Sequence, residues 1–555
     1  MAKKTRPKYI FVVGGVLSGV GKGVTTASIG AIMKAKGFKT TALKADPYIN
    51  VDAGTMNPIE HGEVFVTDDK DETDQDMGNY ERFLDIDLTS MNYMTTGRVY
   101  QTVINNERSM KYKGRCVQVV PHIPEEIIGR IKRAQKLHDA EIVMIEIGGT
   151  VGEYENILFL EAARELQMAN PGDVAVVLVS YLPVPAHLGE MKTKPTQHAS
   201  RLLNQAGLQA DLLIARGRME LDAPRREKLA TFCGVPKENC ISAPDVASIY
   251  EIPLKFEDQQ VGNKLLKTLG LTSRKTDLTP WNTFVKKIHN STKEVKIAVV
   301  GKYFGTGNFT LADSYISVIE SIKHAAWFHN VKPVLEWVDS EEFSAQGGSA
   351  LGGEKEAKKL VAEKLSKYNG IIVPGGFGTR GIEGIISAIQ FAREKKIPYL
   401  GLCYGMQLAT IEFARHVLKK KGAHTVEVNE KAPHQIIVVN PNQAKNIAEE
   451  KYGGTMRLGA YDCDLLAGSK TREAYGTAHI SERHRHRYEF NNEYREEMDN
   501  AGLKVVGVNP ESDLVEIVEL ENHPFFVGTQ FHPEFKSRPM RPHPLFREFV
   551  KAAKK

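Results

Sequence analysis

A cysteine and a histidine–glutamate pair have the residue types of a nucleophilic hydrolase site. Cys403 follows an apolar run and lies between Gly401 and Gly405, and such glycines permit the tight strand-to-helix turn that exposes a nucleophile. His532 and Glu534 are two residues apart. On an extended segment they would share one face, so that the carboxylate could orient the imidazole. The pattern predicts a Cys-His-Glu hydrolase whose histidine and glutamate lie on an extended segment.

A glycine-rich loop near the start of the chain is typical of phosphate binding. The loop, residues 14–23, follows an apolar strand pattern and precedes a helical pattern. Backbone N–H groups and a helix N-terminus would bind the anion, and Lys22 would reach the terminal phosphates. The loop departs from the standard P-loop because five residues, not four, separate Gly15 and Gly21, and because Gly23 replaces the Ser/Thr that usually binds magnesium. A glycine-rich turn with a solvated lysine is the alternative.

Two carboxylates could supply the missing metal ligands. Glu146 ends an apolar strand pattern, which is the place of a Walker-B-like carboxylate. Asp76 ends the acidic stretch 68–76, most of which reads as a solvated loop. Because Mg²⁺ needs only one or two carboxylates besides phosphate oxygens and water, Asp76 and Glu146 would suffice.

A basic segment offers a further anion site. Lys192 and Lys194 lie two residues apart, just before Pro195. We expect the proline to keep the segment out of a helix, so that both lysines could point at a polyphosphate. An exposed basic loop is the alternative.

The composition excludes several classes of protein. The chain has 555 residues, 42% of them apolar and 25% charged, with a net charge of +5, which favours a globular protein over a nucleic-acid or membrane-surface binder. Its five cysteines form no CxxC pair, so we expect a reduced compartment and no zinc site. Since neither a signal peptide nor an 18-residue apolar stretch is evident, we predict a cytoplasmic protein.

The alternation of strand and helix patterns predicts two α/β domains with doubly wound parallel sheets. We predict domains at residues 1–270 and 295–555, joined by a polar linker at 271–294 with a short helix around 281–288. The glycine-rich segment 346–353 reads as a flexible insertion. Strands are predicted at 9–13, 141–147, 174–179, 295–300, 370–373 and 397–402, and helices at 25–36, 124–136 and 155–168.

Motifs spread along the chain resemble those of the CTP synthase family. They are residues 14–23, 44–52, 61–66, 146–152 and 192–198 in the N-terminal half, and 374–381, 403–407, 483–489 and 530–535 in the C-terminal half. They follow the family's order from about residue 8 onward. The resemblance implies a P-loop (dethiobiotin-synthetase-like) amidoligase domain followed by a class I glutamine amidotransferase domain.

The resemblance also implies an activity, which is the ATP-dependent amination of UTP to CTP. Glutamine hydrolysis would supply the ammonia, and ATP would phosphorylate O4 of UTP. The chemistry is coherent because phosphate is a better leaving group than a carbonyl oxygen. Mg²⁺ as cofactor, activation by GTP, feedback inhibition by CTP and a homotetramer are implied with it.

The family's nucleotide contacts map onto this sequence residue by residue. His61 would lie where ammonia enters, and Asp76 and Glu146 would hold Mg²⁺. The implied ATP contacts are Gly19, Val20, Gly21, Lys22, Gly23, Val24, Lys44, Asp76, Asp245 and Val246. The implied UTP or CTP contacts are Ser18, Glu153, Tyr154, Glu155, Lys192, Thr193, Lys194, Pro195, Thr196, Gln197 and Lys228.

The resemblance assigns roles in the glutaminase half as well. Cys403 would attack the amide carbon, His532 would activate the thiol and protonate the departing ammonia, and Glu534 would fix the imidazole tautomer. The backbone N–H groups of Gly376 and Tyr404 would form the oxyanion hole. The implied glutamine contacts are Gly376, Tyr404, Gly405, Met406, Gln407, Glu427 and Arg487.

Tyr404 departs from the small aliphatic residue expected after the nucleophile. Because the oxyanion donor is a main-chain group, we predict that activity survives, although the larger side chain could alter access to the pocket.

Two alternatives stand beside this interpretation. One is a P-loop amidase of cobalamin biosynthesis, against which segments 61–66 and 192–197 argue. The other is a catalytically silent, nucleotide-sensing scaffold. The presence of both candidate sites, with Cys403 in one and Lys22 in the other, argues against a scaffold.

Overall fold

The computed structural model describes residues 6–187, 189–302, 305–306, 309–310, 312–343, 354–440 and 454–555. The predicted insertion at 346–353 lies outside these residues. The chain forms two compact units, of which unit 1 is Met1–Ala53 with Asp76–Val285, and unit 2 is Gly54–Gln75 with Lys286–Lys555. Within the described ranges, no helix combines the length and the apolar character needed to cross a membrane.

Unit 1 is built on a seven-stranded parallel sheet in the order β5-β2-β6-β1-β7-β8-β9. Its strands are β1 (Lys8–Gly15), β2 (Thr40–Asp46), β5 (Tyr93–Thr95), β6 (Ile142–Ile147), β7 (Val174–Tyr181), β8 (Leu212–Gly217) and β9 (Cys240–Pro244). The central strands are mostly apolar and are buried along nearly their whole length because both faces of the sheet are covered; Glu146 near the end of β6 is a buried exception. The predicted strands at 9–13, 141–147 and 174–179 are confirmed.

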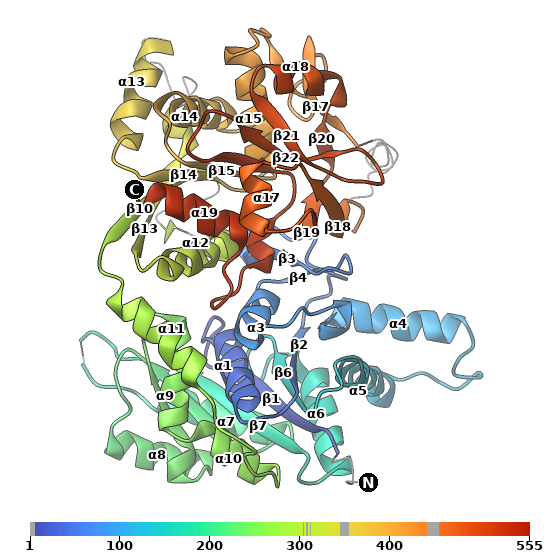
Figure 1. Ribbon diagram of the computed structural model, residues 1–555. Helices are drawn as coiled ribbons and strands as arrows, with labels where there is room; N and C mark the ends of the chain where they lie inside the picture. The colour runs from blue at the N-terminus through green and yellow to red at the C-terminus, as the bar shows by residue number, and fades with distance from the viewer. Residues whose placement is uncertain are drawn as a thin grey trace. The chain divides into compact units, whose positions relative to one another are not determined.

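Helices cover both faces of this sheet (Figure 1). One layer consists of α1 (Lys22–Ala35), α3 (Asp76–Leu84), α9 (Ile252–Asp258) and α10 (Val261–Thr268). The other shares a core with alternate residues of β1 and consists of α4 (Thr96–Arg108), α5 (Val119–Leu137), α6 (Ile157–Ala169), α7 (Lys194–Gln205) and α8 (Ala223–Cys233). The three helices predicted in this half, at 25–36, 124–136 and 155–168, are all present.

A helix also forms in the polar segment between the two halves of the sequence. This helix, α11 (Thr279–Asn290), includes the predicted helix at 281–288. Its Trp281 ring lies 5.2 Å from that of Phe83, and its Phe284 ring lies 5.4 Å from that of Tyr250. The first half of α11 therefore packs on unit 1 through aromatic contacts.

Unit 2 has a nine-stranded mixed sheet in the order β13-β10-β14-β15-β23-β22-β21-β18-β19. The first five strands are parallel, and β22, β21, β18 and β19 extend the sheet in antiparallel fashion. The strands are β10 (Glu294–Gly301), β13 (Lys332–Asp339), β14 (Gly370–Val373), β15 (Tyr399–Leu402), β18 (Arg457–Leu465), β19 (His479–His486), β21 (Leu503–Val508), β22 (Val515–Leu520) and β23 (Phe526–Thr529). The predicted strands at 295–300, 370–373 and 397–402 are confirmed within two residues.

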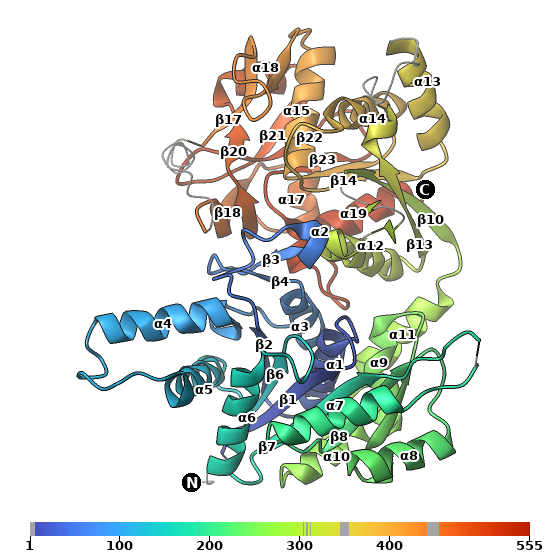
Figure 2. The same ribbon diagram turned by 180° about the vertical axis from the view of Figure 1, so that it is seen from behind.

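Two helical layers cover this sheet as well (Figure 2). One core contains α13 (Glu354–Leu365), α14 (Ile382–Lys395), α15 (Tyr404–His416) and α18 (Arg495–Asn500). The other contains α12 (Ile316–Phe328) and α19 (Pro544–Ala553), with α17 (Lys470–Tyr475) packed on α19. Small sheets are formed by β16 (Ala423–Thr425), β17 (His434–Val439) and β20 (Tyr488–Phe490), and by β11 (Gly305–Thr306) with β12 (Phe309–Thr310).

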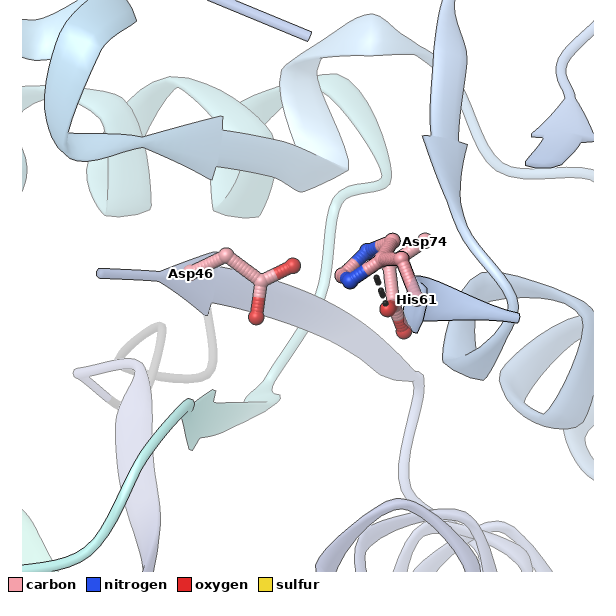
Figure 3. A group of neighbouring side chains, drawn as sticks. All are labelled: Asp46, His61 and Asp74. Atoms are coloured by element: carbon pink, nitrogen blue, oxygen red, sulfur yellow. Dashed lines mark ion pairs between the residues drawn. The ribbon is translucent and has the colours of Figure 1, made fainter. Parts of the chain in front are cut away.

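A segment from the N-terminal half of the sequence, residues 54–75, belongs to unit 2. It contains α2 (Pro58–His61) and a hairpin of β3 (Val64–Val66) and β4 (Glu72–Asp74). Nε2 of His61 lies 3.2 Å from Oδ2 of Asp74 (Figure 3). The buried Phe65 ring meets the Phe535 ring edge-on, with 5.1 Å between their centroids. The domain limits predicted from the sequence, 1–270 and 295–555, place this segment in the N-terminal domain.

Ion pairs fasten the same segment to unit 2. Nε of Arg483 lies 2.5 Å from Oδ1 of Asp68, and Nε of Arg485 lies 2.8 Å from Oε1 of Glu72. Since Arg483 is fully buried, its guanidinium would carry a large desolvation cost without the aspartate.

Candidate functional site

Cys403 lies at a sharp turn between β15 and α15, as the flanking glycines predict. Its backbone has φ 49° and ψ −97°, which is a strained conformation for a residue with a side chain. The Cys403 N–H donates to the carbonyl oxygen of Thr529 on β23 at 2.6 Å. A side chain at position 405 would overlap the carbonyl of Val373, so this glycine lets the helix start directly against β14.

His532 and Glu534 form a buried hydrogen-bonded pair. The distance between Nδ1 of His532 and Oε1 of Glu534 is 2.7 Å. The prediction that they lie on an extended segment is wrong, because Pro533 begins a 3₁₀ turn, Pro533–Lys536, that includes Glu534. The fixed φ of proline suits the first position of such a turn. The carboxylate therefore reaches the imidazole from the turn.

The electrostatics of this pair favour a charged imidazole. Burial opposes the charged form, but the Glu534 carboxylate and Cys403 outweigh it and raise the pKa of His532 to about 10. An imidazolium beside a cysteine stabilises the thiolate, which is the nucleophilic form. The His532 ring also stacks on Phe535, with 5.2 Å between centroids and 18° between planes. The ring is thus fixed by one hydrogen bond and one stacking contact.

The nucleophile has further polar neighbours. Nε2 of Gln530 lies 3.7 Å from Sγ of Cys403, and its Oε1 accepts from Nε2 of Gln407 at 3.3 Å. The Gln407 amide also donates to the carbonyl of Tyr488 at 3.1 Å. The Gln530 amide therefore faces the sulfur as a donor, and the Gln407 amide holds it in that orientation.

A cavity of about 770 Å³ opens at this cysteine within unit 2. Among the predicted site residues, its lining includes Gly376, Cys403, Gln407, Glu427, Arg487, His532 and Glu534. Tyr404, Gly405 and Met406 are buried in the first turn of α15 and do not line it. The Glu427 carboxylate accepts from the N–H of Gly378 at 2.8 Å, and burial raises the pKa of Glu427.

Several lining residues were not predicted from the sequence. Gly375 and Phe377 flank the predicted Gly376, and Arg485 precedes the predicted Arg487 by two positions. Residues from the 54–75 segment also line the cavity, and these are Gly54, Thr55, Met56, Asn57, Glu63 and Val64. No local pattern links that segment to a cysteine some 340 positions away, so only tertiary packing reveals it.

In unit 1, the phosphate loop joins β1 to α1, the context that the motif requires. The helix begins at Lys22, earlier than the predicted residue 25, so the loop ends directly at a helix N-terminus, where anions bind favourably. Nζ of Lys22 donates to the carbonyl of Gly149 at 2.9 Å. Burial lowers the pKa of Lys22, although the Glu146 carboxylate raises it in part.

Two of the predicted site carboxylates converge on one cation. Nζ of Lys44 lies 2.5 Å from Oδ2 of Asp76 and 2.9 Å from Oε1 of Glu146. The Tyr80 hydroxyl donates to the other oxygen of Glu146, and burial, together with this carboxylate, raises the pKa of Tyr80 well above its ordinary value. The ammonium of Lys44 shows that both carboxylates can face a single positive charge. Their oxygen donors fit a magnesium ion.

The structure explains why glycine replaces the usual Ser/Thr at position 23. A Cβ atom on Gly23 would overlap the carboxylate of Asp76, which is the first residue of α3. A hydroxyl side chain and this carboxylate therefore cannot share the space. Asp76 takes the place that the hydroxyl has in a standard P-loop.

The basic segment before Pro195 differs from its prediction. α7 begins at Lys194 with Pro195 in its first turn, so the proline starts a helix there and does not prevent one, because the first turn needs no N–H from it. Nζ of Lys192 lies 2.9 Å from Oε2 of Glu190, whereas Nζ of Lys194 lies 5.7 Å from the ring centroid of Phe232. The two lysines take different partners.

The other predicted nucleotide contacts lie on several elements: Thr196 and Gln197 are in α7, Lys228 is in α8, and Asp245 and Val246 come after the carboxyl end of a strand, where α/β sheets bind ligands. Asp245 and Val246 follow β9, which is three strands from β1 in the sheet. Oδ1 of Asp245 accepts from Arg216 at 3.1 Å. Thr196 and Gln197 are buried, whereas Ser18, Gly19, Glu153, Tyr154, Glu155, Lys228 and Asp245 are exposed. Among the described interactions, none joins two of these exposed residues. The structure does bring Lys22, Lys44, Asp76 and Glu146 together.

A Cys-His-Glu site on one α/β unit and a phosphate loop on another define a glutamine amidotransferase with a nucleotide-binding domain. The comparisons agree, since the family model "CTP synthase N-terminus" matches residues 8–271 and "Glutamine amidotransferase class-I" matches residues 310–552. The chain belongs to the CTP synthase family.

Individual relatives cover nearly the whole chain. CTP synthase of Carboxydothermus hydrogenoformans is 50% identical over 99% of this chain and 99% of its own. CTP synthase of Caldanaerobacter subterraneus is 48% identical over 98% of each chain. Among solved structures, the glutaminase domain of Trypanosoma brucei CTPS with bound acivicin is 37% identical, covers 47% of this chain and 93% of that one, and gives a TM-score of 0.41.

The crowding at Gly23 gives a first prediction. Gly23→Ala should weaken binding of Mg·ATP at least about tenfold, because the added methyl must displace the Asp76 carboxylate or α1. Titration calorimetry measures the affinity. Gly129→Ala is the matched control, since its Cβ would meet only the ends of flexible side chains, with Arg133 at 3.2 Å and Glu126 at 3.9 Å. Unchanged affinity in a folded Gly23→Ala protein would contradict the assignment of this loop.

The His532–Glu534 pair gives a second prediction. Glu534→Gln removes the largest of the influences that raise the pKa of His532, so this pKa should fall well below about 10. Glutamine hydrolysis should lose about 10² or more in kcat. In the unaltered protein, stability from the imidazolium is complete below pH ~6.5 and is lost as pH rises through about 10. The variant should lack this loss at high pH.

Glutamate release and NMR titration of the imidazole check this prediction. Glu482→Gln is the matched control, because Glu482 accepts from His543 at 2.9 Å in another buried pair outside the cavity lining. An imidazole that still titrates near pH 10 in Glu534→Gln would refute the account.

Proposed function

We propose that this protein aminates UTP to CTP with ammonia released from glutamine, at the expense of ATP. One observation carries the proposal. A buried Cys403–His532–Glu534 site and a Lys22–Lys44 site with two carboxylates occur in one chain, and that chain is 50% identical to a CTP synthase over 99% of its length.

The glutaminase reaction follows from the geometry around Cys403. The thiol proton passes to Nε2 of His532 before attack, and the resulting Cys403 thiolate attacks the amide carbon. The resulting imidazolium gives this proton to the departing ammonia, and water then hydrolyses the thioester to glutamate. Glu534 accepts from Nδ1 and so leaves Nε2 facing the reaction. The backbone N–H groups of Gly376 and Tyr404 stabilise the oxyanion.

The synthetase reaction uses the phosphate loop and the cation site of unit 1. Lys22 and Lys44 bind phosphate oxygens of ATP, and O4 of UTP attacks the γ-phosphorus, which breaks its bond to the β,γ-bridging oxygen and gives 4-phosphorylated UTP and ADP. Unprotonated ammonia then displaces the phosphate at C4. Asp76 and Glu146 would hold Mg²⁺, which when bound neutralises charge on the transferred phosphoryl group. The convergence of both carboxylates on the Lys44 ammonium supports this assignment.

Regulation and assembly are proposed on the family alone. GTP activation, CTP inhibition and a homotetramer are properties that membership of the family suggests. The exposed Tyr154, 93% accessible in this chain, lies in the segment predicted to touch UTP or CTP and is available for such a contact.

The proposed reaction is tested by isotope transfer. Purified protein with UTP, ATP, Mg²⁺ and amide-¹⁵N glutamine should form CTP labelled at the exocyclic nitrogen, which mass spectrometry detects. Glutamine hydrolysis without any CTP would overturn the proposal. Omitting ATP is the control, and it should stop CTP formation.

The two sites should separate by mutation. Cys403→Ala should abolish glutamine-dependent CTP formation but retain synthesis from ammonium salts at alkaline pH, where more ammonia is unprotonated. Both rates are measured by CTP release. Cys116→Ala is the control, because this exposed cysteine has no place in either site. Loss of the ammonia-dependent rate in a folded Cys403→Ala protein would contradict the assignment of the two reactions to separate sites.

A further inference from the structure

One carbonyl in the loop that follows β14, next to the cavity-lining residues Gly376 and Phe377, is held by two side chains from different elements. Residues 374–381 join β14 to α14 and include Gly376, the proposed oxyanion donor. The carbonyl of Gly378 accepts from Nζ of Lys302 at 2.7 Å and from the hydroxyl of Tyr404 at 2.9 Å. Its N–H donates to Glu427 at 2.8 Å. Both polar groups of this residue are therefore fixed by side chains.

The two donors also contact each other and Gly376. Nζ of Lys302 lies 5.0 Å from the ring centroid of Tyr404, a cation–π distance. A Cβ on Gly376 would lie 3.5 Å from Cδ1 of Tyr404 and 3.9 Å from Cε of Lys302. A side chain at position 376 would thus be in van der Waals contact with the Tyr404 ring and with the methylene chain of Lys302.

Simple hydrogen-bond satisfaction does not account for this arrangement. The carbonyl of Gly378 is only partly buried, and a single neutral hydroxyl would satisfy it at low cost. Here an ammonium is added, although Lys302 is only 2% exposed and burying a charge is expensive. Burial lowers the pKa of Lys302 to about 8, with Glu427 and Glu341 raising it in part and Arg380 lowering it further. That the chain buries the Lys302 ammonium here despite this cost indicates that the loop of residues 374–381 must be held rigidly.

We propose that Lys302 and Tyr404 are positioning residues that hold the Gly376–Gly378 segment in place as one side of the oxyanion hole. The proposal rests on the glutaminase function proposed above. Tyr404 would then serve both sides of the hole, since its backbone N–H is one donor and its side chain fixes the segment that carries the other. A tyrosine after the nucleophile thereby gains a role that a small aliphatic residue cannot have.

Three variants of the full chain test the proposal. Tyr404→Phe removes only the hydroxyl, Lys302→Met removes the ammonium but keeps the stem, and the third combines both. We expect glutamine hydrolysis to lose about threefold in kcat for Tyr404→Phe and about tenfold for Lys302→Met, in keeping with a neutral and a charged hydrogen bond. Because either donor alone still holds the carbonyl, the double variant should lose more than the product, about 10² or more.

The kinetic signature separates positioning from general damage. The oxyanion forms only in the transition state, so KM for glutamine should stay within about twofold while kcat falls. The rate ratio of unaltered protein to Lys302→Met should be largest below pH 8 and shrink above it, as the ammonium loses its proton. CTP formation from ammonia should not change, because it bypasses the oxyanion hole.

Matched controls exist in the same unit. Tyr368→Phe removes a hydroxyl that donates to Glu336 at 2.6 Å, and Lys470→Met removes an ammonium that donates to the carbonyl of His523 at 2.9 Å. Both should hydrolyse glutamine at the normal rate. Unfolding temperatures identify any variant that fails to fold, and Tyr404→Phe, which keeps its ring, then carries the test.

The outcomes are distinct. A folded double variant within about twofold of the normal kcat overturns the positioning role, as does a loss confined to KM or a loss equal to that of the controls. A Lys302→Met ratio that is flat across pH 8 overturns the part assigned to the ammonium. If the unaltered protein itself hydrolyses no glutamine, the proposed function fails instead.

Discussion

The strained backbone at Cys403 is the constraint on which the C-terminal site depends. A positive φ at a residue with a side chain costs of order 1–3 kcal/mol, and the surrounding sheet must supply this energy. It does so through the parallel neighbours of β15, since the Cys403 N–H is bonded to β23 and position 405 is pressed against β14. The nucleophile is therefore held by three adjacent strands, β14, β15 and β23. Of these, β23 comes more than 120 residues after Cys403 in the sequence.

Buried charge is handled in the same way in both units. In unit 2, burial would neutralise the imidazole of His532, but the adjacent carboxylate of Glu534 outweighs burial. In unit 1, the nearly buried Lys44 has two carboxylates within 3 Å, which is the pairing that a buried ammonium requires. In each site a neighbouring carboxylate thus keeps a buried group positively charged, His532 in unit 2 and Lys44 in unit 1, whereas burial alone would favour its neutral form. A counter-charge at hydrogen-bond distance is the common device.

Much of this could be predicted from sequence because the signals are local. Apolar runs before glycines fix β1, β6, β14 and β15, and the same glycines predict the elbow at Cys403 and the phosphate loop at Lys22. Predictions failed where a proline has two possible effects. Pro533 begins a 3₁₀ turn and Pro195 lies in the first turn of a helix, whereas local rules favoured extended chain at both. Tertiary contacts decide such cases, and Lys302 was missed because its partner is 76 residues away.

The glutaminase cavity is not encoded by the C-terminal half of the sequence alone. Residues 54–57, 63 and 64 line it, and the Phe65 ring meets Phe535, which in turn stacks on the imidazole of His532. This segment leaves unit 1 after β2, which carries Lys44, and returns immediately before Asp76. A chain cut between the two halves would lose both a wall of the cavity and the ring behind its catalytic histidine. Because residues 54–75 are joined in the chain to β2 and α3, the cavity at Cys403 includes a segment whose two ends are attached to the strand and the helix that carry Lys44 and Asp76.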